Sequence, residues 1–574
     1  MRIRLRRPTA GTTAPSAAQL RDPKPARKRR VSRLRRLVLL WLALLLLACA
    51  ANPLAARRPT PAPKPPRGVR AAPSRPTAAP AAASYQPRFT PAGCPFDTAG
   101  EPVECGYLIV PENRAEPDGA EVRVAVAIIR SVAANAASDP VVYLEGRPGG
   151  SALYDAAYWF SSPFRRRRDI ILVDQRGTGY SLPSLNCPEL EAEDIVTVKD
   201  QLHAARACSR RLRRSGVDLR QYNSAAIAAD IADLRVALGL RQINLFGVSY
   251  GTRAALTVLR DHPEGIRSVI LDSAYPPQVD AYSEEGANAG AAIEALLQGC
   301  AADPACAEAY PQLDRTFYRL VARLNRAPAT IERVDAGTGE PYEEELYGDD
   351  LVSHVVGLLY DTAAIPRLPR AIAEAAEGDY GLLAELLDGP PEEEPGDEAP
   401  AGEQLAPEPA RAADAMGSSA ADAGDISYSE GVFYSVECHE EVIFGDLEAA
   451  ERAVAELPRE LHTALLSPFE QTTAICDVWG AGRAGAREEL PVASDVPALV
   501  LAGEYDPITP PRWGRAAAEH LPNSYFFEFP GIGHAAVFAH SCPERIALAF
   551  LDRPRSEPPA TCLARMRGPQ FEVP

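Results

Sequence analysis

Three patterns that define other protein classes are missing from this sequence of 574 residues. The apolar run Leu37–Ala51 falls short of the roughly 20 residues that a bilayer-spanning helix needs. No two cysteines form a C-x-x-C pair, and no cysteine–histidine group has the spacing of zinc ligands, so a zinc site is not expected. No internal repeat is evident. What remains is a balanced globular composition, with 46% hydrophobic and 24% charged residues, long enough for one large domain with an insertion or for two ordinary domains.

Basic side chains are scarce in most of the chain. The first 70 residues hold 18 Lys or Arg against one acid, Asp22, whereas the rest holds 42 basic and 76 acidic side chains. Because nucleic-acid binding needs a basic face, this acidic body argues against nucleic acid as a partner. Surface acidity of this kind mainly favours solubility, and it is also compatible with attraction of cationic ligands.

The N-terminus has the pattern of an export signal. A basic stretch, Arg27–Arg36, precedes the apolar run Leu37–Ala51, whose length suits a signal-peptide core. L-L-A-C at Leu46–Cys49 also resembles a bacterial lipobox, in which Cys49 would be lipidated, and cleavage by signal peptidase near A-C-A is the alternative. Residues 1–51 are therefore predicted to be a signal peptide or lipoprotein signal. The protein is expected to be exported, and either extracellular or anchored at the cell surface.

The cysteines agree with export. Eleven cysteines less Cys49 leave ten, which is enough for five disulfides in an oxidising compartment. Sequence alone does not determine the connectivity, and we expect near neighbours along the chain to pair. The expected pairs are Cys94–Cys105, Cys187–Cys208, Cys300–Cys306, Cys438–Cys476 and Cys542–Cys562.

Composition divides the chain into segments. Residues 52–87 are rich in Pro, Ala and Arg and are predicted to be a disordered tether, which suits a membrane attachment through the N-terminus. Strand and helix signals alternate over residues 88–275 and return over residues 493–565. Between them, residues 276–492 are dominated by Ala-rich helical stretches, interrupted by an acidic, Pro-rich insert at 389–425 that is predicted to be disordered. The sequence thus predicts one sheet domain with a helical cap inserted into it.

Short apolar runs that end in turns are typical of buried parallel strands. Glu121–Ile129 alternates with period two instead, as a half-buried antiparallel strand does. Alternation of such strands with helical segments predicts an α/β fold, a doubly wound sheet with helices on both faces. The short runs are Val141–Leu144, Ile170–Val173, Ile243–Phe246 and Val269–Leu271.

The pentapeptide G-V-S-Y-G at Gly247–Gly251 directly follows the strand Ile243–Phe246 and directly precedes a helical run. A nucleophile elbow needs small residues on both sides of its serine, because the turn is strained and packs tightly between strand and helix. The pentapeptide alone is a weak signal, and its place between strand and helix strengthens it. We therefore predict Ser249 as a catalytic nucleophile.

A serine hydroxyl is a weak nucleophile unless a base takes its proton and an acid orients that base. His534, in the Gly-rich loop after the strand Ser524–Phe529, is the predicted base, with His540 as the alternative. Asp506, after A-L-V-L-A-G-E-Y, is the predicted acid. Asp272, after V-I-L, is the alternative, although a structural carboxylate is another interpretation of it.

Acyl transfer also needs backbone N–H groups that stabilise the oxyanion of the tetrahedral intermediate. Tyr250, which follows the nucleophile, is predicted to supply one of them. The loop E-G-R-P-G-G-S-A after the strand Val141–Leu144 is predicted to supply the other, from Gly149 or Gly150.

Several of these motifs together resemble the proline iminopeptidase and tripeptidyl aminopeptidase group of α/β-hydrolases. They are P-G-G-S-A, D-Q-R-G-T-G-Y-S at Asp174–Ser181, G-V-S-Y-G-T-R, A-G-E-Y-D-P-I-T-P and G-H. The similarity covers about residues 90–565, and its C-terminal part resembles the segment that characterises the tripeptidyl aminopeptidase branch. The resemblance implies the α/β-hydrolase fold with a mostly parallel eight-stranded sheet, an inserted helical cap, cleavage of residues or short peptides from free N-termini, and no cofactor. One departure is E-G-R-P-G at Glu145–Gly149, where the family has His or Gln followed by Gly-Gly-Pro-Gly, so that Arg147 replaces a glycine.

An aminopeptidase must recognise a cationic α-amine, and carboxylates serve this purpose in a partly buried site. The resemblance implies that such groups come from the cap and from the oxyanion loop. The candidates are Glu145, Glu437 and Glu440, with structural salt bridges as the alternative role for each.

The leading hypothesis is an exported serine aminopeptidase that acts on peptide or aminoacyl substrates through an acyl-enzyme on Ser249. A carboxylesterase or lipase-like hydrolase with the same triad is the alternative, because one fold hosts many chemistries. A non-catalytic surface binding protein on a hydrolase scaffold is the third hypothesis, and the presence of all three triad residues argues against it. The sequence does not indicate an oligomeric state.

Overall fold

The computed structural model describes residues 85–191, 197–334, 339–389 and 426–574. The predicted leader with Cys49, nearly all of the predicted tether and the acidic insert from residue 390 onward lie outside the described residues. In the ranges that are described, no helix combines the length and the apolar character needed to cross a membrane.

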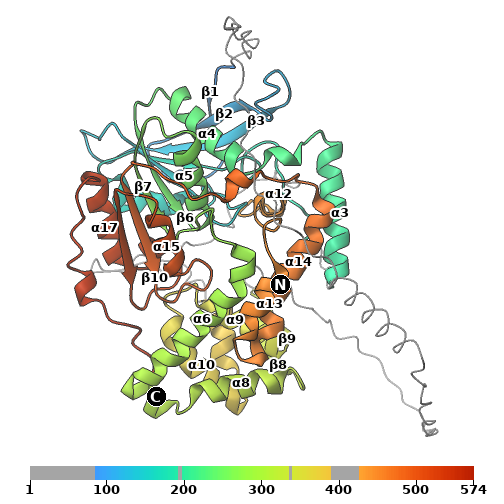
Figure 1. Ribbon diagram of the computed structural model, residues 1–574. Coiled ribbons are helices and arrows are strands. Elements are labelled where there is room, and N and C mark those ends of the chain that lie inside the picture. Colours follow the sequence, from blue (N-terminus) through green and yellow to red (C-terminus); the bar gives the residue numbers. More distant parts are fainter. Residues whose placement is uncertain (1–84, 192–196, 335–338, 390–425) are drawn as a thin grey trace, which may run out of the picture. The chain divides into compact units, whose positions relative to one another are not determined.

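A nine-stranded mixed sheet forms the centre of the fold (Figure 1). Its strand order is β1-β2-β3-β5-β4-β6-β7-β10-β11; the pairs from β1 to β5 are antiparallel, and those from β5 to β11 are parallel. The family resemblance implied eight strands. The sheet has nine, because β1 adds a strand at its edge. The strands are β1 (Arg88–Ala92), β2 (Val103–Pro111), β3 (Glu121–Ile129), β4 (Val141–Leu144), β5 (Ile170–Val173), β6 (Ile243–Val248), β7 (Ile266–Asp272), β10 (Ala498–Gly503) and β11 (Ser524–Phe529).

Helices cover both faces of this sheet. Successive side chains of a strand point to opposite faces, and β4 shows the consequence: Val142 and Leu144 pack in the cluster that holds α3, α4 and α5, whereas Tyr143 packs with Trp159 in the cluster that holds α17. All four β4 residues are therefore buried. The helices around the sheet are α2 (Ala156–Ser161), α3 (Val198–Arg214), α4 (Ser224–Ala237), α5 (Tyr250–Asp261), α15 (Pro511–Ala518), α16 (Ala536–Ala539) and α17 (Ser541–Asp552).

The chain between β7 and β10 forms the cap, which has a hydrophobic cluster of its own built around residues such as Phe317 and Leu296. Contrary to the expectation of helices alone, the cap also holds an antiparallel pair, β8 (Ala329–Val334) with β9 (Pro341–Leu346). Two cap helices also reach the sheet domain: Val432 and Val436 of α12 and the end of α14 pack in the sheet's own cluster. The cap helices are α6 (Ala281–Ala302), α7 (Pro304–Ala309), α8 (Leu313–Leu324), α9 (Gly348–Leu358), α10 (Leu368–Glu377), α11 (Gly381–Asp388), α12 (Glu430–Glu440), α13 (Leu447–Ala455) and α14 (His462–Trp479).

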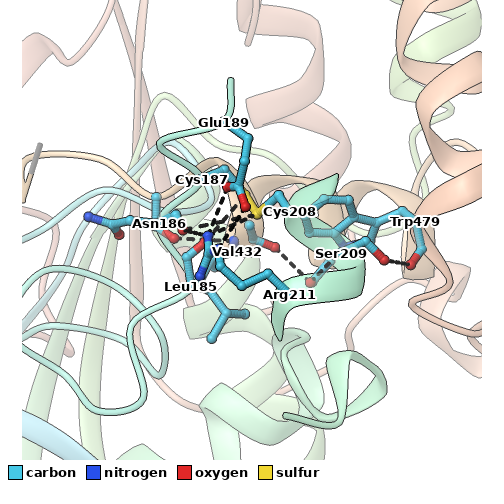
Figure 2. Close-up of a disulfide and its surroundings, with 12 residues drawn as sticks. Leu185, Asn186, Cys187, Glu189, Cys208, Ser209, Arg211, Val432 and Trp479 are labelled. Atoms are coloured by element: carbon cyan, nitrogen blue, oxygen red, sulfur yellow. Dashed lines mark hydrogen bonds and ion pairs between the residues drawn. A yellow bond between two sulfur atoms is a disulfide. The ribbon is translucent and has the colours of Figure 1, made fainter. Parts of the chain in front are cut away.

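Five disulfides join the neighbours that the sequence suggested: Cys94–Cys105, Cys187–Cys208, Cys300–Cys306, Cys438–Cys476 and Cys542–Cys562. Figure 2 shows the second, which ties the loop after β5 to α3. Beside it, Arg211 of α3 donates to both carboxylate oxygens of Glu189 at 2.7 and 2.9 Å, and Ser209 donates to the carbonyl of Trp479 at the end of α14 (Figure 2). The disulfide therefore lies in a junction between the sheet domain and the cap.

Candidate active site

Ser249 occupies the sharp turn between β6 and α5. Its φ of 53° and ψ of −124° are a strained conformation for a residue with a side chain, of a kind that costs on the order of 1 kcal/mol or more. Its N–H donates to the carbonyl of Asp272 at 3.0 Å, and its carbonyl accepts from Thr252 Oγ1 at 2.6 Å. A Cβ at Gly247 would overlap the backbone of Gly251, and a Cβ at Gly251 would overlap the carbonyl end of β4. Packing thus requires both glycines of the pentapeptide.

Asp506 lies in the loop after β10, where the turn D-P-I-T fixes its carboxylate. Oδ1 accepts from the N–H groups of Ile508 and Thr509 at 3.0 and 2.9 Å, and Oδ2 accepts from the Thr509 hydroxyl at 2.7 Å. Oδ2 also lies 2.8 Å from Nδ1 of His534. Because this contact occupies Nδ1–H, the second ring nitrogen, Nε2, is left to accept a proton.

The two members of this pair stabilise each other's charge. Burial alone would raise the pKa of Asp506, but the neighbouring His534 and the hydrogen bonds from Thr509 outweigh it and hold the pKa below its usual value. Burial alone would lower the pKa of His534, but the Asp506 carboxylate reverses the effect and raises the pKa. An imidazole of this kind is a stronger base than a free one.

Asp272 anchors the loop that carries His534. Its two carboxylate oxygens accept from the N–H groups of Ala536 and Val537 at 3.0 and 2.8 Å, and its carbonyl accepts from Ser249. Ser273 adds a bond from the N–H of Ala535 at 2.9 Å. These contacts hold the loop that carries His534 against the end of β7, beside the turn that carries Ser249. They favour the structural interpretation of Asp272, whose pKa burial raises to about 7.

His540, the alternative base, caps α17. Its Nδ1 accepts from the N–H of Cys542 at 3.0 Å. Burial and the nearby Arg545 lower its pKa. Its contacts are those of a capping residue, whereas His534 has the carboxylate partner that a general base needs.

The cap contributes Tyr360 to the site. Its carbonyl accepts from the N–H of His534 at 3.1 Å, and its ring lies against the imidazole with 4.8 Å between the ring centroids. Next to it, the Thr362 hydroxyl accepts from the N–H of Gly533 at 3.0 Å. The sequence analysis missed Tyr360, because it belongs to no motif and only the folded cap brings it to His534.

The loop after β4 lies against the nucleophile. A Cβ at Gly146 would stand 3.1 Å from Cβ of Ser249. The backbone therefore approaches Ser249 more closely than a residue with a side chain could without crowding. Gly150 is wrong as an oxyanion donor, because its N–H donates to the carbonyl of Arg147 at 2.7 Å. Gly149 stays a prediction. In the described part of the chain, the N–H groups of Tyr250, Gly149 and Arg147 have no acceptor, and that of Arg147 directly follows Gly146, whose backbone abuts Ser249.

Glu145 begins the same loop and is half-buried. Its carboxylate accepts from the N–H of Gly146 at 2.7 Å. Burial raises its pKa to about 7, against the hydrogen bonds from Gly146 and Tyr143, and the acids Asp155 and Asp174 add to the rise. Its role in amine binding stays a prediction.

Glu440 has partners from the sheet domain. Its carboxylate accepts from the N–H and the hydroxyl of Ser224 at the start of α4, and it faces Arg253 at 3.8 Å. These protein partners favour the structural alternative for Glu440.

Glu437 belongs to a different group, the cap carboxylate cluster, which we define as Glu285, Glu437 and Glu441. Burial raises the pKa of Glu437 well above its usual range, and Glu441 raises it further. Burial raises the pKa of Glu441 to about 7 although Arg253 lies 2.6 Å away and Tyr275 donates to it at 2.6 Å. Burial likewise raises the pKa of Glu285 to about 7. Burial and mutual repulsion thus favour the protonated, neutral forms of these acids, because their surroundings would not fully neutralise the ionised forms.

Glu285 connects this cluster to the catalytic pair. Burial strongly raises the pKa of the Tyr360 hydroxyl, and the nearby carboxylates of Asp506 and Glu285 raise it further. Tyr360 is therefore close enough to the Asp506 and Glu285 carboxylates for both charges to act on its hydroxyl, and its ring contacts His534. The sequence analysis missed Glu285, since nothing in the sequence distinguishes it from its neighbour Glu284, which pairs with Arg512 at 3.0 Å.

One group of described residues has the atoms of a metal site. Sγ of Cys187, a carboxylate oxygen of Glu189 and Sγ of Cys208 lie within 4.8 Å of one another. The two sulfurs are bonded to each other in a disulfide and Arg211 pairs with the carboxylate. This group is a cross-link and does not fit a metal ion, because a cysteine binds a metal as a thiolate and these two cysteines are bonded to each other.

Comparison with known families agrees with this geometry. Residues 139–349, which include the elbow and the loop after β4, match the family model described as "alpha/beta hydrolase fold". The chain therefore has the α/β-hydrolase fold. Residues 466–562 of this α/β-hydrolase, which include Asp506 and His534, match the model described as "TAP-like protein".

The curated relatives of this α/β-hydrolase are hydrolases and peptidases. It is 27% identical to "Putative hydrolase YuaR" of Escherichia coli over 48% of this chain and 56% of the relative, and 29% identical to "Tripeptidyl aminopeptidase" of Streptomyces lividans over 31% and 37%. These matches span less than two thirds of either relative. "Serine protease Hip1" of Mycobacterium tuberculosis is 24% identical over 78% of this chain and 84% of its own. Among solved structures, a proline iminopeptidase of Mycobacterium smegmatis is 16% identical and covers 78% of this chain and 98% of its own, with a TM-score of 0.37.

Proposed function

We propose that this α/β-hydrolase is a serine aminopeptidase that releases N-terminal residues or short peptides from substrates with a free α-amine. The cap carboxylate cluster carries the proposal: its acids have raised pKa values, and one of them, Glu285, acts on the hydroxyl of Tyr360, whose ring contacts His534. A buried excess of carboxylates binds a cation favourably, because each carboxylate gains a charge-assisted hydrogen bond and loses an unfavourable neighbour. An esterase has no need for such a group.

The catalytic steps follow from the geometry of the turn and the pair. The Ser249 hydroxyl attacks the scissile carbonyl while Nε2 of His534 takes its proton, and Asp506 stabilises the resulting imidazolium. The N–H groups of Tyr250 and Arg147 stabilise the oxyanion of the tetrahedral intermediate. His534 then gives its proton to the leaving amine, which departs and leaves an acyl-enzyme on Ser249. Water, activated by the same imidazole, hydrolyses that ester, and the mechanism needs no cofactor.

The cap is proposed to recognise the substrate. Glu285 and Glu437 come from α6 and α12, so the helices of the insertion hold the amine while the sheet domain holds the reacting groups. With its α-amine bound there, the substrate reaches Ser249 in a fixed register. An acetylated N-terminus has no positive charge and leaves the carboxylates uncompensated, so blocked peptides are expected to bind poorly.

Export completes the proposal. The five disulfides support it, since such bonds form and persist in oxidising compartments. The basic stretch followed by an apolar run in the first 51 residues also supports it. Fractionation of cells that express the full chain, with and without an inhibitor of lipoprotein processing, tests both export and the lipid on Cys49.

A panel of chromogenic substrates tests the activity. Aminoacyl and tripeptidyl anilides with free amines are expected to be cleaved. Their acetylated counterparts are expected to be cleaved at least about tenfold more slowly. The variant Ser249→Ala is expected to abolish both reactions. Ser215→Ala, at an exposed serine that ends α3, is the matched control and keeps full activity. Cleavage of simple esters alone, with no anilide hydrolysed, would assign the protein to the carboxylesterase alternative.

A further inference from the structure

We propose that the Arg147 side chain binds a carboxylate on the leaving part of the substrate and so determines which peptides are cleaved. The inference rests on the proposed function, because it takes the substrate to be a peptide held by its amine. It assigns Arg147 a role in specificity, distinct from the role of its N–H in stabilising the oxyanion.

The position of Arg147 follows from its main chain. It directly follows Gly146, whose backbone abuts Ser249, and its own carbonyl accepts from Gly150, which closes the turn. A side chain that starts from this peptide begins beside the reacting carbonyl. Arg147 is exposed, and its φ of 40° lies in the left-handed region that favours glycine. The chain thus carries a long cationic side chain at a position where a glycine would be less strained.

The guanidinium has no carboxylate partner. It lies 4.7 Å above the ring of Tyr428, and its charge acts on the hydroxyl of Tyr360, where it opposes the rise of the pKa that burial, Asp506 and Glu285 cause. In the described ranges no ion pair involves Arg147, whereas many other arginines have one. Its charge is therefore available for a ligand, in a site whose other charged groups are mostly acids.

Both charged regions lie beside α12, and Glu437 also raises the pKa of the Tyr428 hydroxyl. Tyr428, under the guanidinium, precedes the helix, and Glu437 of the cap carboxylate cluster lies in its last turns. At 1.5 Å per residue, the helix axis rises by about 10 Å from Glu430 to Glu437. An extended peptide covers such a distance with about three residues. The α-amine is held at the cluster, the scissile carbonyl reaches Ser249, and the residues after the scissile bond lie toward Arg147.

The chemistry favours a carboxylate as the group that Arg147 binds. A guanidinium presents a planar set of donors that matches the two oxygens of a carboxylate, and its stacking on Tyr428 orients that plane. Two sources offer this group on the leaving side of a peptide: the free C-terminus of a short substrate, and an acidic side chain on the first residue after the scissile bond. Both would be attracted to Arg147, and the neutral analogues of both would not.

Matched peptide pairs test the inference. The first pair differs only in a free C-terminus against a C-terminal amide one residue after the scissile bond, and the second in Glu against Gln at that residue, with the C-terminus amidated in both. The wild type is expected to show a kcat/KM ratio of about fivefold or more in favour of the charged member of at least one pair, as for a partly exposed ion pair. The pair that shows the ratio identifies the source.

Variants of Arg147 locate the effect. Arg147→Gln is expected to bring the ratio close to one, Arg147→Lys to keep part of it, and salt to reduce it in the wild type. The ratio within one variant is the readout, because any general change at the oxyanion loop cancels in it. Arg555→Gln, an exposed arginine beside Gln242 and Ile266 at the opposite edge of the sheet, is the matched control and keeps the wild-type ratio.

Two outcomes would overturn the inference while leaving the proposed function intact. One is a wild type that cleaves the charged and neutral members of both pairs at equal rates. The other is a ratio that survives unchanged in Arg147→Gln. If no peptide of either pair is cleaved while esters are, the proposed function fails instead, so the two failures are distinguishable.

Discussion

The Asp506–His534 pair and the cap carboxylate cluster are both groups of ionisable side chains shielded from solvent, yet the fold stabilises charge in one and disfavours it in the other. Asp506 and His534 are each other's counter-ion, so the pKa of the acid is lowered and that of the base is raised. In the cluster, burial raises the pKa values of Glu285 and Glu441 to about 7. Arg253 is the cation that faces this group, and it is shared with Glu440.

This difference separates chemistry from recognition. In the proposed function, the Asp506–His534 pair exchanges protons in every turnover, and the fold already holds it complete, with Asp506 fixed by neighbours such as Thr509. The cluster would hold the positive charge of the substrate and remains uncompensated until that ligand arrives. The cost of burying such a group is repaid on binding, which makes the free enzyme less stable than its complex.

The largest effect is expected from breaking the catalytic pair. Asp506→Asn removes the acid that orients and charges His534, and kcat should fall by about 10⁴-fold. Asp272→Asn is the matched variant, because this carboxylate binds the His534 loop but not the ring. It should cost about 1–3 kcal/mol of stability, since an amide cannot accept both N–H groups equally well, and much less of kcat. Urea unfolding and steady-state kinetics measure the two effects. A larger loss of kcat in Asp272→Asn than in Asp506→Asn would reverse the assignment of the acid.

A smaller effect is expected from neutralising the cluster. Glu285→Gln should lower kcat/KM on free-amine substrates by about 10–100-fold, the value of one charge-assisted hydrogen bond, and leave acetylated and ester substrates unchanged. Glu448→Gln, at an exposed acid in the first turn of α13, serves as the control. Equal losses on acetylated and free-amine substrates would show that Glu285 supports the fold and does not bind the amine.

The smallest effect is a change in the shape of the pH profile. His534 must be neutral to act as a base, and Glu285 must be ionised to bind a cation; the pKa of His534 is raised and that of Glu285 is about 7. Activity on free-amine substrates should therefore fall as the pH drops, because Glu285 gains a proton near pH 7 and His534 gains one at its raised pKa. It should also fall above about pH 8, where the substrate amine loses its charge. Activity on ester substrates should fall only at low pH, where protonation of the single group His534 removes the base. Profiles of kcat/KM from pH 5 to 9 measure this, and a bell shape for both substrate classes would contradict amine recognition.

The sequence predicted the fold of the sheet domain because local chemistry determines its strands and the loops at their ends. The glycines around Ser249 are required by close backbone packing, and the turn that begins at Asp506 bonds its own carboxylate. The strands β4, β5 and β6 were visible as apolar runs because both of their faces are covered. The assignment of triad roles to these residues remains for the variants above to test.

The recognition groups were harder to predict because tertiary packing selects them. Glu284 and Glu285 are adjacent acids, and only the rotation of α6 sends one toward Arg512 and the other toward the cluster. Tyr360 meets His534 through the fold of the cap. Gly150 was misassigned because a glycine-rich loop does not reveal which N–H closes its own turn.

The place of the cap in the chain affects synthesis of the protein. Strands β7 and β10 are neighbours in the sheet, although the whole cap separates them along the chain. Chains emerge N-terminus first, for an exported protein on the far side of the membrane, and domains tend to fold as they emerge. A nascent chain that has already formed its nucleophilic turn therefore lacks both Asp506 and His534 until its last strands are translated. An unfinished polypeptide would thus be inert toward the peptides around it, without a separate inhibitory segment.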